Sequence, residues 1–457
     1  MSNFVFSRRA LQQSINRLAA LLQRDQLASI VDRLNRFGNS RLPAMWELVM
    51  LDALSGDGVL RHEIQLPNGR RPDIELTVSL AEGEQILIIG DVATVSDAGL
   101  DEQNPVNVLS AELNRLATKA GLNPNHFGYD VRGDRVGHYG DGRMKLFLPA
   151  KGQLLLLMGK EVAPWIYRLK AAPQRPDSFD YAEHEISFSL TYDPEQRYAR
   201  GGHLSYDVAA SRDRNPLFKA LKGKVDQLKE APPMALRLVI ACDGDSALLR
   251  QSPLMRSPGT FSAREVAEDF LRKNSSIDAV LLATIEEQRQ VLDPTTTYRM
   301  KYDLVVAPSH ARSTRMTPVV IAALETVLRK TVQRIPQPIQ SAYNAAARCR
   351  LPGCGPDMIG GYKMNDLSIS LSSRALQRLL AGEITGNEFI AAHGWNDTHG
   401  PSNPFSRAAR SGQMITKIEI EVAGDKDDDW LTFSFGPPDP AAAPFSIPSS
   451  MMPEEAS

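Results

Sequence analysis

The sequence predicts an α/β protein with a mixed central sheet that is flanked by helices. Three observations lead to this fold class: an apolar helix over residues 43–54, a hairpin and a buried strand over 59–95, and strand–helix–strand alternation over 215–307. A chain of 457 residues is long enough for two or three domains. We therefore expect the core sheet to be assembled from two stretches, 41–97 and 205–310.

The first element, residues 43–54, reads as a buried helix. Pro43 suits its first turn, and apolar residues lie almost all round it. Glu47 is the exception. A carboxylate on a buried helix needs a cation, a metal or a hydrogen-bond partner, because uncompensated burial is costly.

A hairpin follows this helix. Apolar residues alternate over 59–66 and again over 74–80, and the turn signal Asn68-Gly69 lies between the two runs. Asp73 stands at the entrance of the return strand. The next segment, 85–95, is apolar on both faces, which is typical of a central strand, and Asp91 interrupts it.

Three acids therefore come from three neighbouring elements: Glu47, Asp73 and Asp91. Converging carboxylates are how proteins hold a hard divalent cation, Mg²⁺ or Mn²⁺, because these ions prefer oxygen ligands. The three acids are our candidate metal ligands. The alternative is that Asp73 ends a turn and Asp91 caps a strand.

Glu47, Pro72-Asp73 and Asp91-Val92-Ala93 resemble the signature of the PD-(D/E)xK nuclease superfamily, whose fold is restriction-endonuclease-like. The resemblance implies a magnesium-dependent nuclease that hydrolyses phosphodiester bonds, with DNA the favoured substrate. Because this superfamily is rich in restriction, repair and anti-phage enzymes, it also implies antiviral defence against foreign DNA. The chain departs from the signature at Ala93, where the superfamily has a lysine.

A lysine on a later helix is a candidate to replace the one that the signature has at the position of Ala93. Asn215-Pro216 is a clear helix start. Lys224 falls in the middle of the apolar side of that helix, and Gln227 lies on its flank. In proteins of the superfamily the lysine can move to a neighbouring helix together with a glutamine, so the resemblance makes Lys224 and Gln227 candidate catalytic residues. The alternative is that Lys224 extends its ammonium to the surface along its aliphatic stem.

Composition divides the rest of the chain. We expect an N-terminal helical segment over 1–40, whose arginines form a solvated face, and an inserted subdomain over 98–204 that contains a hydrophobic strand region at 144–158. A small C-terminal α/β module should occupy 311–437, and the Pro-, Ala- and Ser-rich tail over 438–457 should be disordered. Asp243-Gly244-Asp245 follows a strand at the position where ligands collect in open sheets, although a plain turn is the favoured explanation.

The overall composition limits the choice of partners. A formal net charge of −2 means that any binding of nucleic acid must come from local patches. Three cysteines suit a reducing cytoplasm, and no apolar run is long enough to span a membrane. A protein partner or a homo-oligomer stays open. The alternative function is a catalytically inactive nuclease-like subunit that binds nucleic acid or scaffolds a larger complex.

Overall fold

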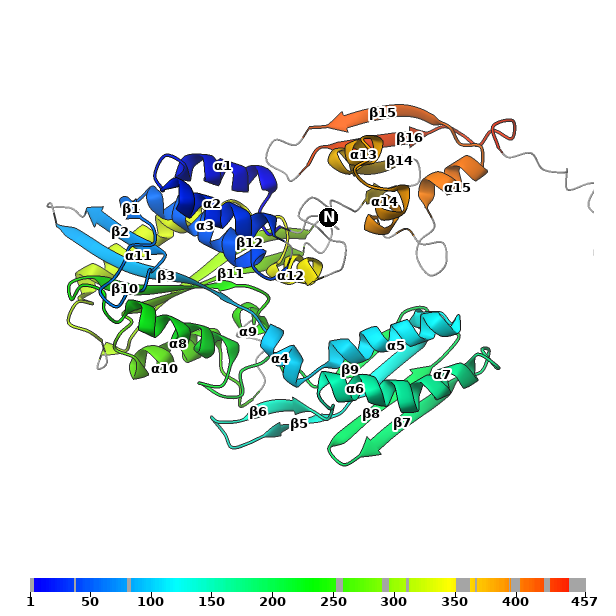
Figure 1. The fold of residues 1–457 in the computed structure, drawn as a ribbon, viewed down its shortest axis with the longest axis horizontal. Coiled ribbons are helices and arrows are strands. Elements are labelled where there is room, and N and C mark those ends of the chain that lie inside the picture. Colours follow the sequence, from blue (N-terminus) through cyan, green and yellow to red (C-terminus); the bar gives the residue numbers. More distant parts are fainter. Residues whose placement is uncertain are drawn as a thin grey trace, which may run out of the picture.

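The computed structural model describes residues 4–36, 38–79, 84–251, 258–289, 296–309, 312–350, 362–365, 368–393, 395, 403–422 and 428–443. Its centre is a six-stranded mixed sheet in the order β1-β2-β3-β10-β11-β12 (Figure 1). The strands β3, β10 and β11 are parallel, and the remaining pairings are antiparallel. The six strands are β1 (Val59–Arg61), β2 (Ile74–Ser79), β3 (Gln85–Val95), β10 (Leu236–Asp243), β11 (Ala279–Arg289) and β12 (Thr296–Val306).

Helices cover both faces of this sheet, which confirms the predicted fold class. One face packs against α1 (Arg8–Leu18), α2 (Arg24–Asn35), α3 (Arg41–Ser55), α11 (Pro318–Arg334) and α12 (Ala342–Arg350). The opposite face packs against α8 (Pro216–Leu228), α9 (Ala247–Arg250) and α10 (Ala263–Lys273). Residues alternate along β3 between the two cores, with Ile88 and Val92 in the first and Ile89 and Ala93 in the second. Both faces are buried, as the apolar run over 85–95 predicts.

The predicted hairpin is only partly formed. The strand expected over 59–66 ends at Arg61, and Glu63 adopts a left-handed conformation with φ 51°. His62 turns inward instead, where its Nδ1 lies 2.7 Å from the carbonyl oxygen of Asp73. The chain then loops back to β2, with Gly69 at φ 75°. This inward contact explains why the extended segment stops early.

Residues 98–204 form a separate hydrophobic core. A four-stranded sheet in the order β7-β8-β4-β9 packs against helices, and β5 pairs with β6. The elements are α4 (Ala98–Gln103), α5 (Val106–Ala120), η2 (Pro124–His126), β4 (Phe127–Val131), β5 (Gly133–Val136), β6 (Arg143–Leu146), α6 (Lys151–Leu157), the π-helix η3 (Met158–Val162), α7 (Ala163–Leu169), β7 (Asp177–Glu183), β8 (Ile186–Tyr192) and β9 (Arg200–His203).

The strand region expected at 144–158 is wrong. Only β6 is extended, and the chain is helical from Lys151 onward. The buried residues Leu154, Met158, Val162 and Ile166 recur at a spacing of four, so the apolar run belongs to one side of a helix.

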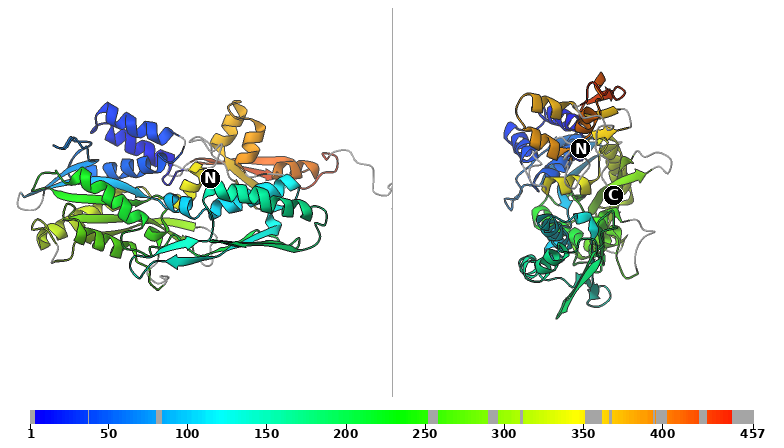
Figure 2. Two further views of the ribbon diagram at one scale, coloured as in Figure 1. Left: turned by 60° about the horizontal axis from the view of Figure 1, so that its bottom comes forward. Right: turned by 90° about the vertical axis from the view of Figure 1, so that its right-hand side faces the viewer.

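The C-terminal residues form a second small sheet, in the order β13-β14-β16-β15, with its own core. This module and residues 98–204 both lie beyond one end of the central sheet, the end at which β3 finishes (Figures 1 and 2). The tail expected to be disordered lies outside the described residues from 444 onward. The elements are β13 (Tyr362–Met364), β14 (Ser368–Ser372), α13 (Ser373–Leu380), α14 (Gly386–Ala392), α15 (Pro404–Arg410), β15 (Ile415–Glu421) and β16 (Trp430–Phe435).

Within the described part of the chain, no helix has the length and apolar character needed to cross a membrane.

Candidate functional site

Asp91 lies in the middle of β3, where it is completely buried. It is aligned with Val239 of the parallel strand β10. Because residues alternate along a strand, the Asp91 side chain shares the α8 side of the sheet with Ile89 and Ala93. A carboxylate there requires compensation, since burying an isolated charge is unfavourable.

The compensating cation is Lys224. The helix α8 begins at Asn215, whose side chain accepts a hydrogen bond of 2.9 Å from the backbone N–H of Phe218, and Pro216 follows at the first helical position. Two turns later, Lys224 extends from the apolar side of the helix and its ammonium contacts Oδ1 of Asp91. The Lys224 side chain is 22% exposed, so the ion pair lies at the boundary between the core and solvent.

Asp73 stands beside this pair. Its Oδ2 accepts a hydrogen bond of 2.9 Å from the backbone N–H of Val92, the residue after Asp91. Its carbonyl oxygen accepts from Nδ1 of His62, which must carry the proton because a carbonyl oxygen only accepts. Two bonds to neighbouring elements therefore hold the Asp73 carboxylate next to Asp91.

The proximity of the two acids changes the protonation of Asp91. Its pKa is raised to about 8, first by burial and then by the negative charge of Asp73, while the Lys224 ammonium opposes both. Oδ2 of Asp91 is buried and accepts no hydrogen bond, although a hydrogen bond between the Asp91 and Asp73 side chains also contributes to the raised pKa. The buried oxygen is therefore available to a cation once Asp91 has lost its proton.

Glu47 approaches the same region from α3. Arg33 of α2 donates two hydrogen bonds of 2.7 Å to its two carboxylate oxygens. Nε2 of His62 lies 3.6 Å from Oε1 of Glu47. The partner that a buried glutamate requires is therefore an arginine, in a two-pronged pair that is among the stronger side-chain interactions.

These side chains border a cleft of about 300 Å³ that opens between α3, β3 and α8. Glu47 and Lys224 both line it, whereas Asp73 and Asp91 lie behind its wall, next to the lining residue Val92 and in contact with Lys224. Ala93, at the position where the superfamily has a lysine, also lines it. Gln227 lies one turn beyond Lys224, is half-buried and is not among the lining residues. The residues that line the cleft are Pro43, Glu47, Val92, Ala93, Thr94, Ala220 and Lys224.

Sequence analysis overlooked Arg33 and His62. Arg33 was assigned to a solvated face, and only the packing of α2 on α3 brings it to Glu47. His62 did carry a signal, because it shares an alternating apolar face with Leu60 and Ile64 in the sequence. A histidine in that pattern points to a buried polar contact.

The fit of a divalent cation is partial. The unpartnered Oδ2 of Asp91 beside the Asp73 carboxylate suits a hard cation. Among the described residues, however, no group of three or more His, Cys, Asp or Glu side chains is arranged to hold a metal. Glu47 does not complete such a group, since Arg33 occupies both of its oxygens.

Comparisons with protein-family models, with curated proteins and with solved structures found no match to this chain. A functional assignment therefore depends on the geometry of the site.

Proposed function

We propose that this protein is a divergent PD-(D/E)xK-type nuclease that hydrolyses phosphodiester bonds of nucleic acid. The observation that carries the proposal is the contact between the Lys224 ammonium and the buried carboxylate of Asp91, beside Asp73 and at the edge of a cleft. A lysine that only extended its ammonium to solvent along its aliphatic stem would not contact a completely buried acid of a central strand.

In this proposal Asp73 and Asp91 hold Mg²⁺ or Mn²⁺. Such a cation supplies an activated water and neutralises charge on the scissile phosphate. The contribution of the chain itself is positional. Asp73 is held by the backbone of Val92, and the ammonium of Lys224 stabilises the negative charge that develops on the phosphate oxygens.

The remaining two candidate residues, the acid Glu47 and the amide Gln227, differ in their roles. Arg33 keeps the Glu47 carboxylate directed at the cleft, where it can bind a cation through water. The proposal gives no role to Gln227, which lies one turn beyond Lys224 on α8 and does not line the cleft. The resemblance of the residue pattern makes DNA the favoured substrate and foreign DNA a favoured target, and the low cysteine content agrees with a cytoplasmic enzyme.

A second candidate is a nuclease-like subunit that binds nucleic acid without cleaving it. The ion pair between Arg33 and Glu47 favours this candidate, since it leaves only two acids close to each other at the site. The two candidates differ in one measurable property, which is turnover.

The deciding experiment is the substitution Lys224→Met. Methionine retains most of the buried stem and removes the charge. We expect the rate of cleavage of plasmid DNA, linear DNA or RNA in Mg²⁺ or Mn²⁺ to fall by about 10²–10³-fold. Lys222, which is exposed on the outer side of α8, provides the matched control, and Lys222→Met should cleave like wild type.

Equal cleavage by both variants would give Lys224 a structural role. If wild type binds nucleic acid but cleaves none of these substrates in either metal, the inactive subunit becomes the correct description.

A further inference from the structure

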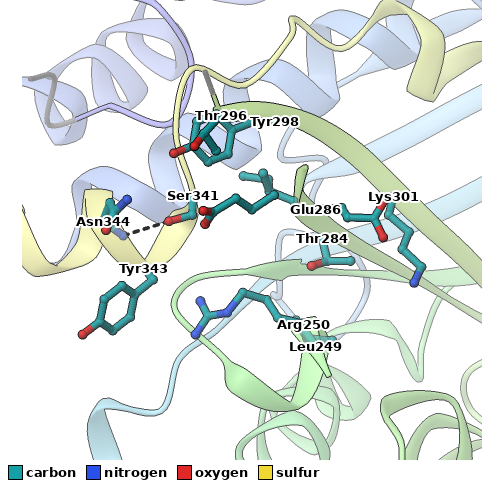
Figure 3. A pocket seen from close by; sticks show the side chains of 12 residues that line it. Leu249, Arg250, Thr284, Glu286, Thr296, Tyr298, Lys301, Ser341, Tyr343 and Asn344 are labelled. Carbon is teal, nitrogen blue, oxygen red and sulfur yellow. Dashed lines mark hydrogen bonds between the residues drawn. The ribbon is translucent and has the colours of Figure 1, made fainter. Parts of the chain in front are cut away.

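A second and larger pocket, of about 680 Å³, lies at the end of β11 and shares no lining residue with the Asp91 cleft (Figure 3). Its walls come from β11, β12, the end of α9 and the start of α12. Asp91 is aligned through Val239 with Val280, and Thr284 lies four residues further along β11. Thr284 thus lies about 13 Å beyond Asp91 along the strand direction, and the pocket and the cleft have no lining residue in common.

Thr284 is the first sign that the pocket receives a ligand. The residue is 8% exposed, and its Oγ1 is buried without a hydrogen-bond partner. Figure 3 shows the side chain at the centre of the pocket floor. Buried hydroxyl groups in proteins almost always have a partner, so an unpaired one that faces a cavity points to a polar ligand.

One end of the pocket is built for an anion. The guanidinium of Arg250 lies 5.6 Å from the ring centroid of Tyr343, toward which it is turned in Figure 3. Tyr343 and Asn344 belong to the first turn of α12, and Ser341 immediately precedes the helix, where its Oγ accepts a hydrogen bond of 3.2 Å from the Asn344 N–H. A helix N-terminus beside a guanidinium attracts phosphate, because the backbone N–H groups and the paired N–H donors of the positively charged guanidinium all face the anion.

The partners of Arg250 leave room for such an anion. Its Nη2 donates a long hydrogen bond of 3.5 Å to Asp245 Oδ1, whereas Nη1 has no hydrogen-bond partner and lies 3.6 Å from Asp243 Oδ1. These are weak contacts compared with the 2.7 Å bonds between Arg33 and Glu47. The guanidinium can therefore bind a phosphate oxygen without breaking a short ion pair.

The remaining wall suits a sugar and a base. Glu286 and Glu287 line the pocket, and carboxylates accept hydrogen bonds from ribose hydroxyls and from amino groups. Tyr298 and Tyr343 offer aromatic rings for stacking. Lys301 lies at the opposite end from Arg250 (Figure 3). Cation, carboxylate, hydroxyl and ring thus occur together in a space large enough for a small ligand.

We propose that this pocket binds a nucleoside phosphate, with the phosphate against Arg250 and the first turn of α12 and with the nucleoside over Thr284. The ligand is either a free nucleotide or one unit of a nucleic acid strand, since both carry the same groups. The inference goes beyond the proposed nuclease activity, because it requires neither a metal nor cleavage.

The test is calorimetric titration of the full chain in EDTA with AMP, GMP, CMP, UMP, orthophosphate and a short oligothymidylate. We expect binding of at least one mononucleotide or of the oligonucleotide, and much weaker binding of orthophosphate. Thr284→Val should weaken this binding about tenfold, the effect of one hydrogen bond. It should not lower the melting temperature, because the hydroxyl that it removes has no partner.

Further measurements test which residues hold the phosphate and whether the ligand is a free nucleotide or part of a strand. Arg250→Lys keeps the charge but loses the fork, so it should weaken binding of nucleotides as well. Thr297→Val, on β12 but outside the pocket lining, is the matched control and should bind like wild type. Preference for a mononucleotide identifies a free effector, and preference for the oligonucleotide identifies a strand.

Three results would overturn the proposal: no binding of any of these ligands, equal affinity for orthophosphate, or affinity unchanged in both Thr284→Val and Arg250→Lys. Because the titrations contain no metal, none of these results depends on whether the protein cleaves nucleic acid.

Discussion

Two completely buried aspartates lie on neighbouring parallel strands, and their surroundings differ. Asp91 in β3 has a second acid, Asp73, at its side and a single cation, Lys224, at one oxygen. Asp243 at the end of β10 accepts hydrogen bonds from the backbone N–H groups of Asp245 (3.0 Å) and Ser246 (2.9 Å).

The difference in surroundings separates an acid suited to function, Asp91, from an acid with a structural role, Asp243. Burial raises the pKa of both acids, and at Asp243 the Arg250 guanidinium and the turn N–H groups oppose this rise without cancelling it. At Asp91 a neighbouring carboxylate adds to the effect of burial, and the site borders a cleft. One carboxylate oxygen is without a hydrogen-bond partner in each of the two aspartates, so this feature does not distinguish them. A buried acid with fixed backbone donors closes a turn, whereas one crowded by another acid is suited to binding a cation.

The largest expected effect is on catalysis at Asp91. In the proposed nuclease, Asp91→Asn should reduce cleavage by at least about 10²–10³-fold and abolish the rise in melting temperature that Mn²⁺ produces in wild type. The metal-free variant should be as stable as wild type or more stable, because asparagine carries no charge beside Asp73 and needs no proton to stay neutral. Cleavage assays and thermal unfolding with and without Mn²⁺ measure both quantities.

Asp243→Asn is the matched control for this substitution, since asparagine keeps an acceptor for the turn. It should retain cleavage. A large loss of metal-free stability in Asp91→Asn would instead make Asp91 a structural residue like Asp243.

The next largest expected effect is a loss of folding stability when Asp243 is substituted. Asp243→Ala removes the acceptor of two backbone N–H groups and should lower the free energy of unfolding by about 2–3 kcal/mol. Urea denaturation measures this loss. Cleavage per folded molecule should stay near wild type, and a specific loss of activity in a stable Asp243→Ala protein would contradict the distinction between the two acids.

A smaller effect concerns pH. Folding raises the pKa of the Asp91 carboxyl from its ordinary value of 3.8 to about 8, so the folded state binds the proton more tightly than the unfolded state. The metal-free protein should therefore lose stability as pH rises between about 4 and 8, by at most about 1.4 kcal/mol per pH unit from this group. Asp91→Asn should flatten this slope, and chemical denaturation at several pH values tests it. Identical slopes in both proteins would show that Asp91 is ionised throughout this range.

The smallest expected effect is a partial recovery of the cleavage rate by a second substitution. Ala93 and Asp91 point to the same side of β3, and Ala93 lines the cleft. In a Lys224→Met background, Ala93→Lys should place an ammonium near Asp91 from the strand and recover about tenfold of the lost rate, one charge-assisted contact in imperfect geometry. No recovery in a folded double variant would mean that the position of the ammonium, and not only its presence, decides activity.

Local patterns predicted much of this architecture. The buried strand over 85–95 and the helix start at Asn215 were both readable, because each depends on residues that are close in the chain. The wheel position of Lys224 likewise predicted that its side chain would turn toward the sheet, since helix geometry alone decides which residues share a face.

The sequence by itself therefore determined most of the central elements and the side of each that is buried, although it predicted a strand where the helix α6 forms. Only the tertiary structure decided which charges meet. Arg33 reaches Glu47 because α2 packs on α3, and Asp73 lies beside Asp91 because its carboxylate accepts the Val92 N–H across two strands. Such contacts join residues that are distant in the chain, and their energies depend on burial and register, which periodicity does not encode.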